Sequence, residues 1–73
     1  MMVGHQTFNP QDLAGIRLAP DLDGCENWSL FALPIQGQPI LARRGTHAAM
    51  LPLLLQAGAQ WAEAHKGGLH AKP

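Results

Sequence analysis

The stretch that most constrains the fold is residues 46–66, THAAMLPLLLQAGAQWAEAHK. Its apolar residues recur at the i, i+3, i+4, i+7 and i+11 spacing that places side chains on one face of a helix. The members of this stripe are Met50, Leu53, Leu54, Ala57 and Trp61. Thr46 is a suitable N-cap, and Gly67 with Gly68 can adopt the positive φ that ends a helix. The pattern predicts one amphipathic helix that buries a single stripe.

One residue argues against a straight helix. Pro52 lies beyond the expected first turn, so it removes one backbone hydrogen bond and presses on the carbonyl of Ala48. The sequence therefore predicts a frayed opening turn, a bend near Ala48, and a firm helix from Leu51 onward.

A second organised unit precedes this helix. The β-prone runs 28–33 and 40–43 flank the near-symmetric stretch PIQGQP, with Gly37 at its centre. A central glycine that supplies positive φ between two such runs predicts a hairpin. Strand alternation divides the first run into two faces, Trp28, Leu30 and Ala32 on one and Ser29, Phe31 and Leu33 on the other. Neither face is wholly polar, so either both are partly covered or one is a docking surface.

The residues before the hairpin predict smaller elements. Asn9 is a fit cap for a single helical turn, with Pro10 at its first position and Gly15 at its end. Residues 16–18 alternate as a short edge strand that Pro20 stops, and residues 21–27 are rich in turn formers.

Together these elements predict an α+β fold, a small two- or three-stranded antiparallel sheet packed against one C-terminal α-helix. An isolated hairpin is marginal in water, so the helix must lie across one face of the sheet. We expect a single small domain over residues 1–73, with flexible ends at residues 1–8 and 67–73, which show no period.

The size of the chain favours binding over catalysis. A chain of 73 residues has a thin core, and a rigid catalytic cleft needs scaffold on several sides. We therefore expect a non-enzymatic protein without a small-molecule substrate. The single Cys25 allows no internal disulfide, the N-terminus does not resemble a signal peptide, and the apolar run MLPLLL is too short to cross a membrane. The expected location is the cytoplasm.

Motifs for metal or covalent chemistry are weak. Asp21, Asp23 and Gly24 resemble the opening of a calcium loop, but the closing acidic position would fall on Ala32. The histidines have no usual ligand spacing, and Cys25 has no CxxC or CxxH partner. There is no glycine-rich phosphate loop. No metal or cofactor is expected.

The most suggestive cluster is Arg43 and Arg44 beside the start of the helix, where free backbone amides favour an anion. The acidic residues gather in the first half of the chain and the basic ones in the second. Either these arginines pair with Asp21, Asp23 or Glu26, or they contact an acidic protein surface or a phosphate backbone. We expect an interface formed by the following residues: Arg17, Trp28, Arg43 and Arg44. The alternative is a small nucleic-acid-binding protein that uses Arg43, Arg44 and the helix N-terminus.

The chain as a whole resembles the small transcription regulators of lytic xanthomonad bacteriophages that bind the host RNA polymerase. The resemblance covers HQTFNPQDLAGIRLAPDLDG, the hairpin ENWSLFALPIQGQPILARR and the alanine-rich helix. It implies a protein of the host cell cytoplasm that binds the large subunits of host RNA polymerase near the RNA exit region. Such a protein inhibits promoter-dependent initiation and promotes terminator read-through, with possible contact to the nascent RNA. The resemblance assigns no individual contact residues.

Overall fold

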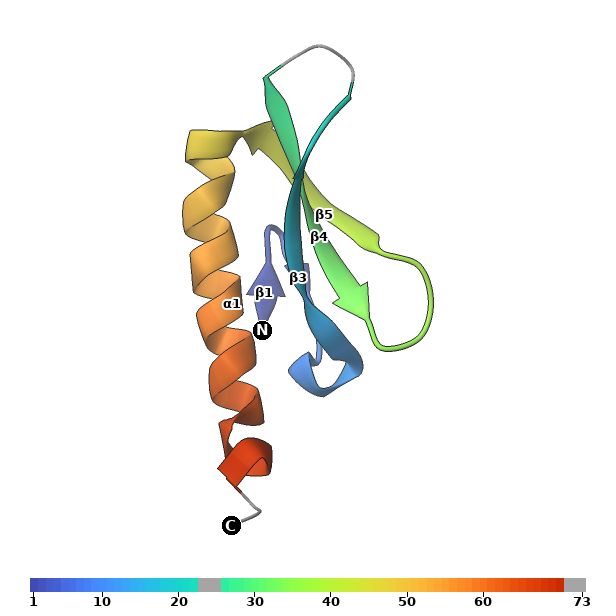
Figure 1. Cartoon of the computed structure of the whole chain (residues 1–73), viewed down its shortest axis with the longest axis vertical. Helices are drawn as coiled ribbons and strands as arrows, with labels where there is room; N and C mark the ends of the chain where they lie inside the picture. The colour runs from blue at the N-terminus through green and yellow to red at the C-terminus, as the bar shows by residue number, and fades with distance from the viewer. Residues whose placement is uncertain (23–25, 71–73) are drawn as a thin grey trace.

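The computed structural model describes residues 1–22 and 26–70, with side chains described up to residue 66 outside the gap. It shows a three-stranded antiparallel sheet, a small N-terminal hairpin and one long helix (Figure 1). The order is β1 (Met2–Val3), β2 (Gln6–Thr7), the 3-10 turn η1 (Pro10–Asp12), β3 (Leu13–Pro20), β4 (Asn27–Pro34), β5 (Ile40–Thr46) and α1 (His47–His70). The predicted α+β architecture is confirmed, with the three-stranded alternative realised.

The sheet has the order β3-β4-β5, so β4 is central and β3 is an edge strand, as predicted. Both strand pairs are antiparallel, and the register pairs Arg17 with Phe31 and Phe31 with Leu41. Gly37 in the β4–β5 loop has φ of 108°, which confirms the positive φ expected there. The β3 strand begins three residues earlier than predicted, because the chain turns directly from η1 into the sheet at Leu13.

The core lies between α1 and one face of the sheet, which we call the inner face. Its central cluster of buried residues is Val3, Leu30, Met50 and Ala57, and Ile16, Leu18, Trp28, Leu53 and Leu54 pack against them. The predicted helical stripe is therefore confirmed as the buried face. Trp61 adds a polar tie, because its Nε1–H donates to the carbonyl of Leu13 at 2.8 Å. Pro34, which lies opposite Leu13 in β4, has no N–H to offer that carbonyl.

The helix has its predicted N-cap, but its opening turn and its C-terminal end differ from the prediction. Thr46 does cap it, since its hydroxyl oxygen accepts from the Ala49 N–H at 3.2 Å. However, the helix begins at His47, so the predicted frayed opening turn is wrong. This turn is held by the cap and by the ring of Trp28, whose centroid lies 4.7 Å from that of the His47 ring. The helix also continues through Gly67 and Gly68 to His70. Glycine permits a helix stop without requiring one. Residues 71–73 of the expected tail lie outside the described residues.

The first eight residues are an ordered hairpin, which corrects the predicted loose N-terminus. Val3 is completely buried, and β1 contacts both α1 and β4. The loop between β1 and β2 is Gly4–His5, with φ of 63° at the glycine, as a type II′ turn requires. A Cβ at Gly4 would lie 3.0 Å from the carbonyl oxygen of Ala42. Only glycine therefore lets this hairpin pack so closely against β5.

The single turn at Asn9 is confirmed in part. The Asn9 side chain accepts from the Gln11 N–H at 3.0 Å, and Pro10 occupies the first position. The turn ends at Asp12, so Gly15 is not its terminator but part of β3, next to a register shift. The predicted loop after Pro20 is seen at Asp21, Leu22 and Glu26; Asp23, Gly24 and Cys25 lie outside the described residues.

Candidate binding surface

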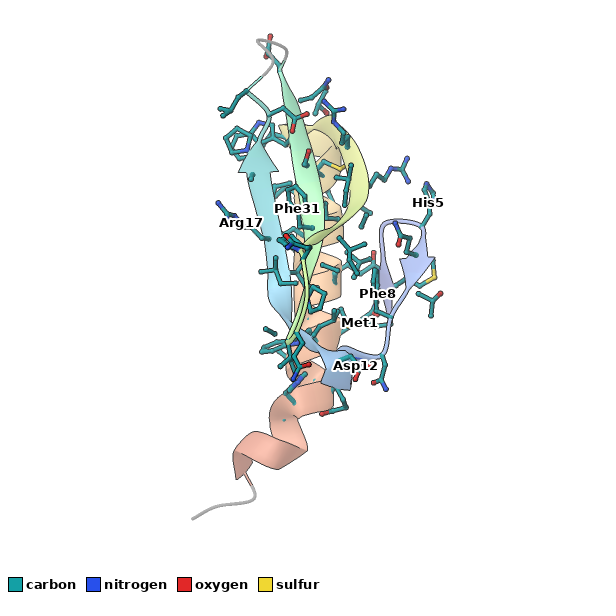
Figure 2. All side chains as sticks on the ribbon, turned by 90° about the vertical axis from the view of Figure 1, so that its right-hand side faces the viewer. Met1, His5, Phe8, Asp12, Arg17 and Phe31 are labelled. Atoms are coloured by element: carbon teal, nitrogen blue, oxygen red, sulfur yellow. The ribbon has the colours of Figure 1, made fainter. Side chains whose placement is uncertain are left out.

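The face of the sheet opposite the helix, the outer face, is not covered by any other element among the described residues. Figure 2 looks onto it, with α1 behind the strands and Phe31 near the middle. Alternation and register place Arg17 and Ala19 of β3, Phe31 and Leu33 of β4 and Leu41 of β5 on this face. Leu41 is 44% exposed, and Phe31 and Leu33 are partly exposed. The outer face is therefore the face that remains available as the docking surface considered from the sequence.

A shallow hollow of about 360 Å³ runs along the β3–β4 half of this face. Its floor is Phe31 and Leu33, and the β4–β5 loop reaches it through Pro39. The lining is mainly apolar; in full it comprises Arg17, Ala19, Pro20, Asp21, Leu22, Phe31, Leu33 and Pro39. A hollow of this kind suits apolar side chains of a macromolecular partner better than a small polar molecule.

Arg17 is the cation of this hollow. It is exposed, lies opposite Phe31 and projects from the β3 side of the sheet (Figure 2). Among the described residues it makes no hydrogen bond or ion pair. A guanidinium that is not committed within the chain is available to an anionic group of a partner.

Asp21 is the anion of the hollow, and it is committed. Its Oδ1 accepts from the Ser29 hydroxyl at 2.5 Å, and its Oδ2 accepts from Nε of Arg44 at 2.8 Å. These bonds join the end of β3 to β4 and β5. The hydrogen bond from Ser29, and then that from Arg44, hold the pKa of Asp21 below its ordinary value of 3.8. Of the two alternatives for Arg44, pairing within the chain is therefore the one observed. Its partner Asp21 comes from the acidic first half of the chain.

The other predicted site residues lie elsewhere. Arg43 extends from β5 toward the N-terminal hairpin, where its guanidinium contacts Nε2 of His5. Trp28 points to the inner face, packs against the core and meets the ring of His47 edge-on. The structure thus does not bring the four predicted residues onto one surface. Only Arg17 stands on the open part of the outer face.

Sequence reasoning did not single out the apolar partners of Arg17. The alternation of β4 already set Phe31 and Leu33 on a face separate from Trp28 and Leu30. What it lacked was the register of β3, which brings Arg17 opposite Phe31. The alternation of the two strands does not by itself fix that register, so the hollow is seen only in the folded sheet.

The described residues contain no group of three or more histidine, cysteine, aspartate or glutamate residues placed to hold a metal ion. They also contain no helix long and apolar enough to cross a membrane. The chain matches no known protein-family model, no curated protein sequence and no solved structure.

Proposed function

We propose that this protein binds the large subunits of the host bacterial RNA polymerase in the host cell cytoplasm, inhibits promoter-dependent initiation and promotes terminator read-through. The resemblance to the xanthomonad phage regulators supplies the partner. The observation that carries the binding role is the open outer face, where uncommitted Arg17 stands beside the apolar floor formed by Phe31 and Leu33. Such a surface joins an apolar anchor to a charge that sets orientation.

The mode of action that fits this surface is occlusion. A small domain without a covered outer face inhibits a large enzyme by occupying one critical patch of it. Apolar contacts with Phe31 and Leu33 provide most of the affinity, and Arg17 restricts which acidic patch is accepted. No reaction is required of the chain itself.

The experiment is capture of purified host RNA polymerase on the immobilised chain, followed by transcription assays at a promoter and across a terminator. The wild type should retain polymerase at near-stoichiometric yield, reduce promoter-dependent transcripts and increase read-through. Arg17→Glu should weaken capture, whereas Lys66→Glu, a matched charge reversal on the exposed helix, should not. Absence of polymerase on the wild-type chain would refute the proposal.

The alternative of direct nucleic-acid binding through Arg43, Arg44 and the helix N-terminus receives less support. Arg44 is paired with Asp21, which brings a negative charge to the same place, and Arg43 contacts His5. A salt titration with random-sequence DNA and RNA separates the two functions. Affinity driven by phosphates falls steeply with salt concentration, whereas binding through an apolar surface does not.

A further inference from the structure

The two edges of the sheet are not equivalent. The N-terminal hairpin lies along the β5 edge, where the Gln6 side chain donates to the carbonyl of Leu41 at 3.0 Å and Gly4 approaches the carbonyl of Ala42. Among the strands of the described residues, β3 pairs with β4 on one side and with none on the other. The open edge of the sheet is therefore the edge next to Arg17.

The register shows which backbone groups this edge presents. The Asp21 N–H donates to the carbonyl of Asn27 at 2.9 Å, so these two residues form a hydrogen-bonded antiparallel pair. Such pairs alternate with non-hydrogen-bonded pairs along the ladder. The backbone N–H and C=O groups of Ala19, Arg17 and Gly15 therefore point toward β4. The intervening residues Ile16 and Leu18 consequently direct their N–H and C=O groups outward, away from the sheet. They are the groups that an added strand would bond.

The same alternation fixes the position of Arg17 relative to such a strand. Arg17 would occupy a non-hydrogen-bonded pair, in which facing Cα atoms are only about 4.5 Å apart and side chains are closest. A second copy of β3 paired antiparallel about Arg17 would bring two guanidinium groups together. Like charges directly opposite are destabilising, whereas a carboxylate in that place is favourable.

We propose that the β3 edge binds an extended segment of the partner as a fourth strand, with an acidic residue opposite Arg17 and apolar residues two positions away on either side. These apolar side chains lie over the hollow, near Phe31 and Leu33. The backbone groups of Ile16 and Leu18 supply affinity, and the pair with Arg17 supplies selectivity. This inference rests on the proposed function only for the identity of the partner.

Gly15 provides a way to test the added strand without disturbing the fold. A Cβ built on Gly15 meets no atom within 4 Å, and this position does not require positive φ. Alternation places it on the outer face, opposite Leu33. Gly15→Trp therefore puts a large ring where the incoming side chains would lie, while the inner face is unchanged.

The experiment uses the full chain labelled with ¹⁵N and two synthetic peptides of alternating valine and threonine. One peptide carries a single central glutamate and its twin carries lysine. We expect the glutamate peptide to bind about tenfold more tightly than the lysine peptide. It should shift the amide signals of Ile16 and Leu18 and slow their hydrogen exchange.

Variants of the chain separate the two parts of the inference. Arg17→Glu should reverse the preference between the peptides, Gly15→Trp should weaken both by severalfold, and Lys66→Glu should leave both unchanged. Equal binding of the two peptides by the wild type would overturn the inference, as would amide shifts confined to other elements. A dimer detected by sedimentation, with protection at Ile16 and Leu18, would also overturn it, because a second copy would then be the occupant.

The inference and the proposed function fail on different results. Equal capture of polymerase by the wild type, Arg17→Glu and Gly15→Trp would refute the proposed fourth strand but not the proposed binding of polymerase. If the glutamate peptide binds in a manner that depends on Arg17 but polymerase is not captured, the strand-binding site is supported and the proposed partner is refuted.

Discussion

Truncation of Val3 to alanine tests whether the N-terminal hairpin belongs to the core. Val3 is fully buried in the cluster that contains Leu30, Met50 and Ala57. The change removes two methyl groups, which corresponds to about 1.6 kcal/mol of transfer free energy. Incomplete collapse of the resulting cavity raises the expected loss to about 2 to 3 kcal/mol.

That loss is large for this chain. A domain of 73 residues has an unfolding free energy of about 4 to 11 kcal/mol, so the variant loses a substantial part of it. At this size each kcal/mol lowers the melting temperature by about 4 to 8 °C. Urea denaturation followed by tryptophan fluorescence measures the free energy, because Trp28 and Trp61 both adjoin elements of the core. Thermal melting by circular dichroism provides the second probe.

The matched control is Met2→Ala. Met2 precedes Val3 in β1 but is 49% exposed, so its truncation should change the free energy by no more than about 0.5 kcal/mol. If Val3→Ala lowers the free energy of unfolding by no more than Met2→Ala does, the hairpin does not contribute to the core. The same result would restore the sequence-based expectation of a loose N-terminus.

Three further changes probe separate contacts. Gly4→Ala should destabilise the chain by more than about 1 kcal/mol in urea denaturation, because φ is positive there and the Cβ meets the Ala42 carbonyl. Trp61→Phe should cost about 1 to 2 kcal/mol in the same assay by leaving the Leu13 carbonyl without its donor. Since the pKa of Asp21 is lowered in the folded chain, its pairing stabilises above about pH 4 and is lost as the pH falls through the folded-state pKa. Thermal melts should therefore show a smaller loss of stability on acidification in Asp21→Asn than in the wild type.

The elements that sequence predicted well are those with a long periodic signal. The helix carries its apolar stripe over several turns, from Met50 to Trp61, and no strand accommodates that period. The central hairpin combines two β-prone runs with Gly37, whose positive φ the structure confirms. In both cases local preference and tertiary packing favour the same structure, so local reasoning was sufficient.

The N-terminal hairpin was missed because its strands have two residues each and carry no period. Its stability comes from tertiary contacts, above all the burial of Val3 between the helix and β4. A weak local signal was present. Gly4 stands at the first position of a two-residue loop, where a type II′ turn requires glycine.

Of the residues that line the outer hollow, the sequence predicted only Arg17 as an interface residue. Arg43 and Arg44 were grouped because they are adjacent in sequence, yet neighbours in a strand point to opposite faces. Arg44 reaches Asp21 on the outer side, while Arg43 turns toward His5 of the hairpin.

The two faces of the sheet make different kinds of contact. The inner face depends on burial of Leu30 against the helix, with Val3 completing the core from the hairpin side. On the outer face, Asp21 accepts from both Ser29 and Arg44 and so links the end of β3 to β4 and β5. These polar bonds tie the three strands together at one end of the outer face, whereas the apolar residues that hold the sheet against the helix are on the inner face. Phe31 and its neighbours lie beside the β3 edge that no described strand pairs with, which is where the proposed partner would add its strand.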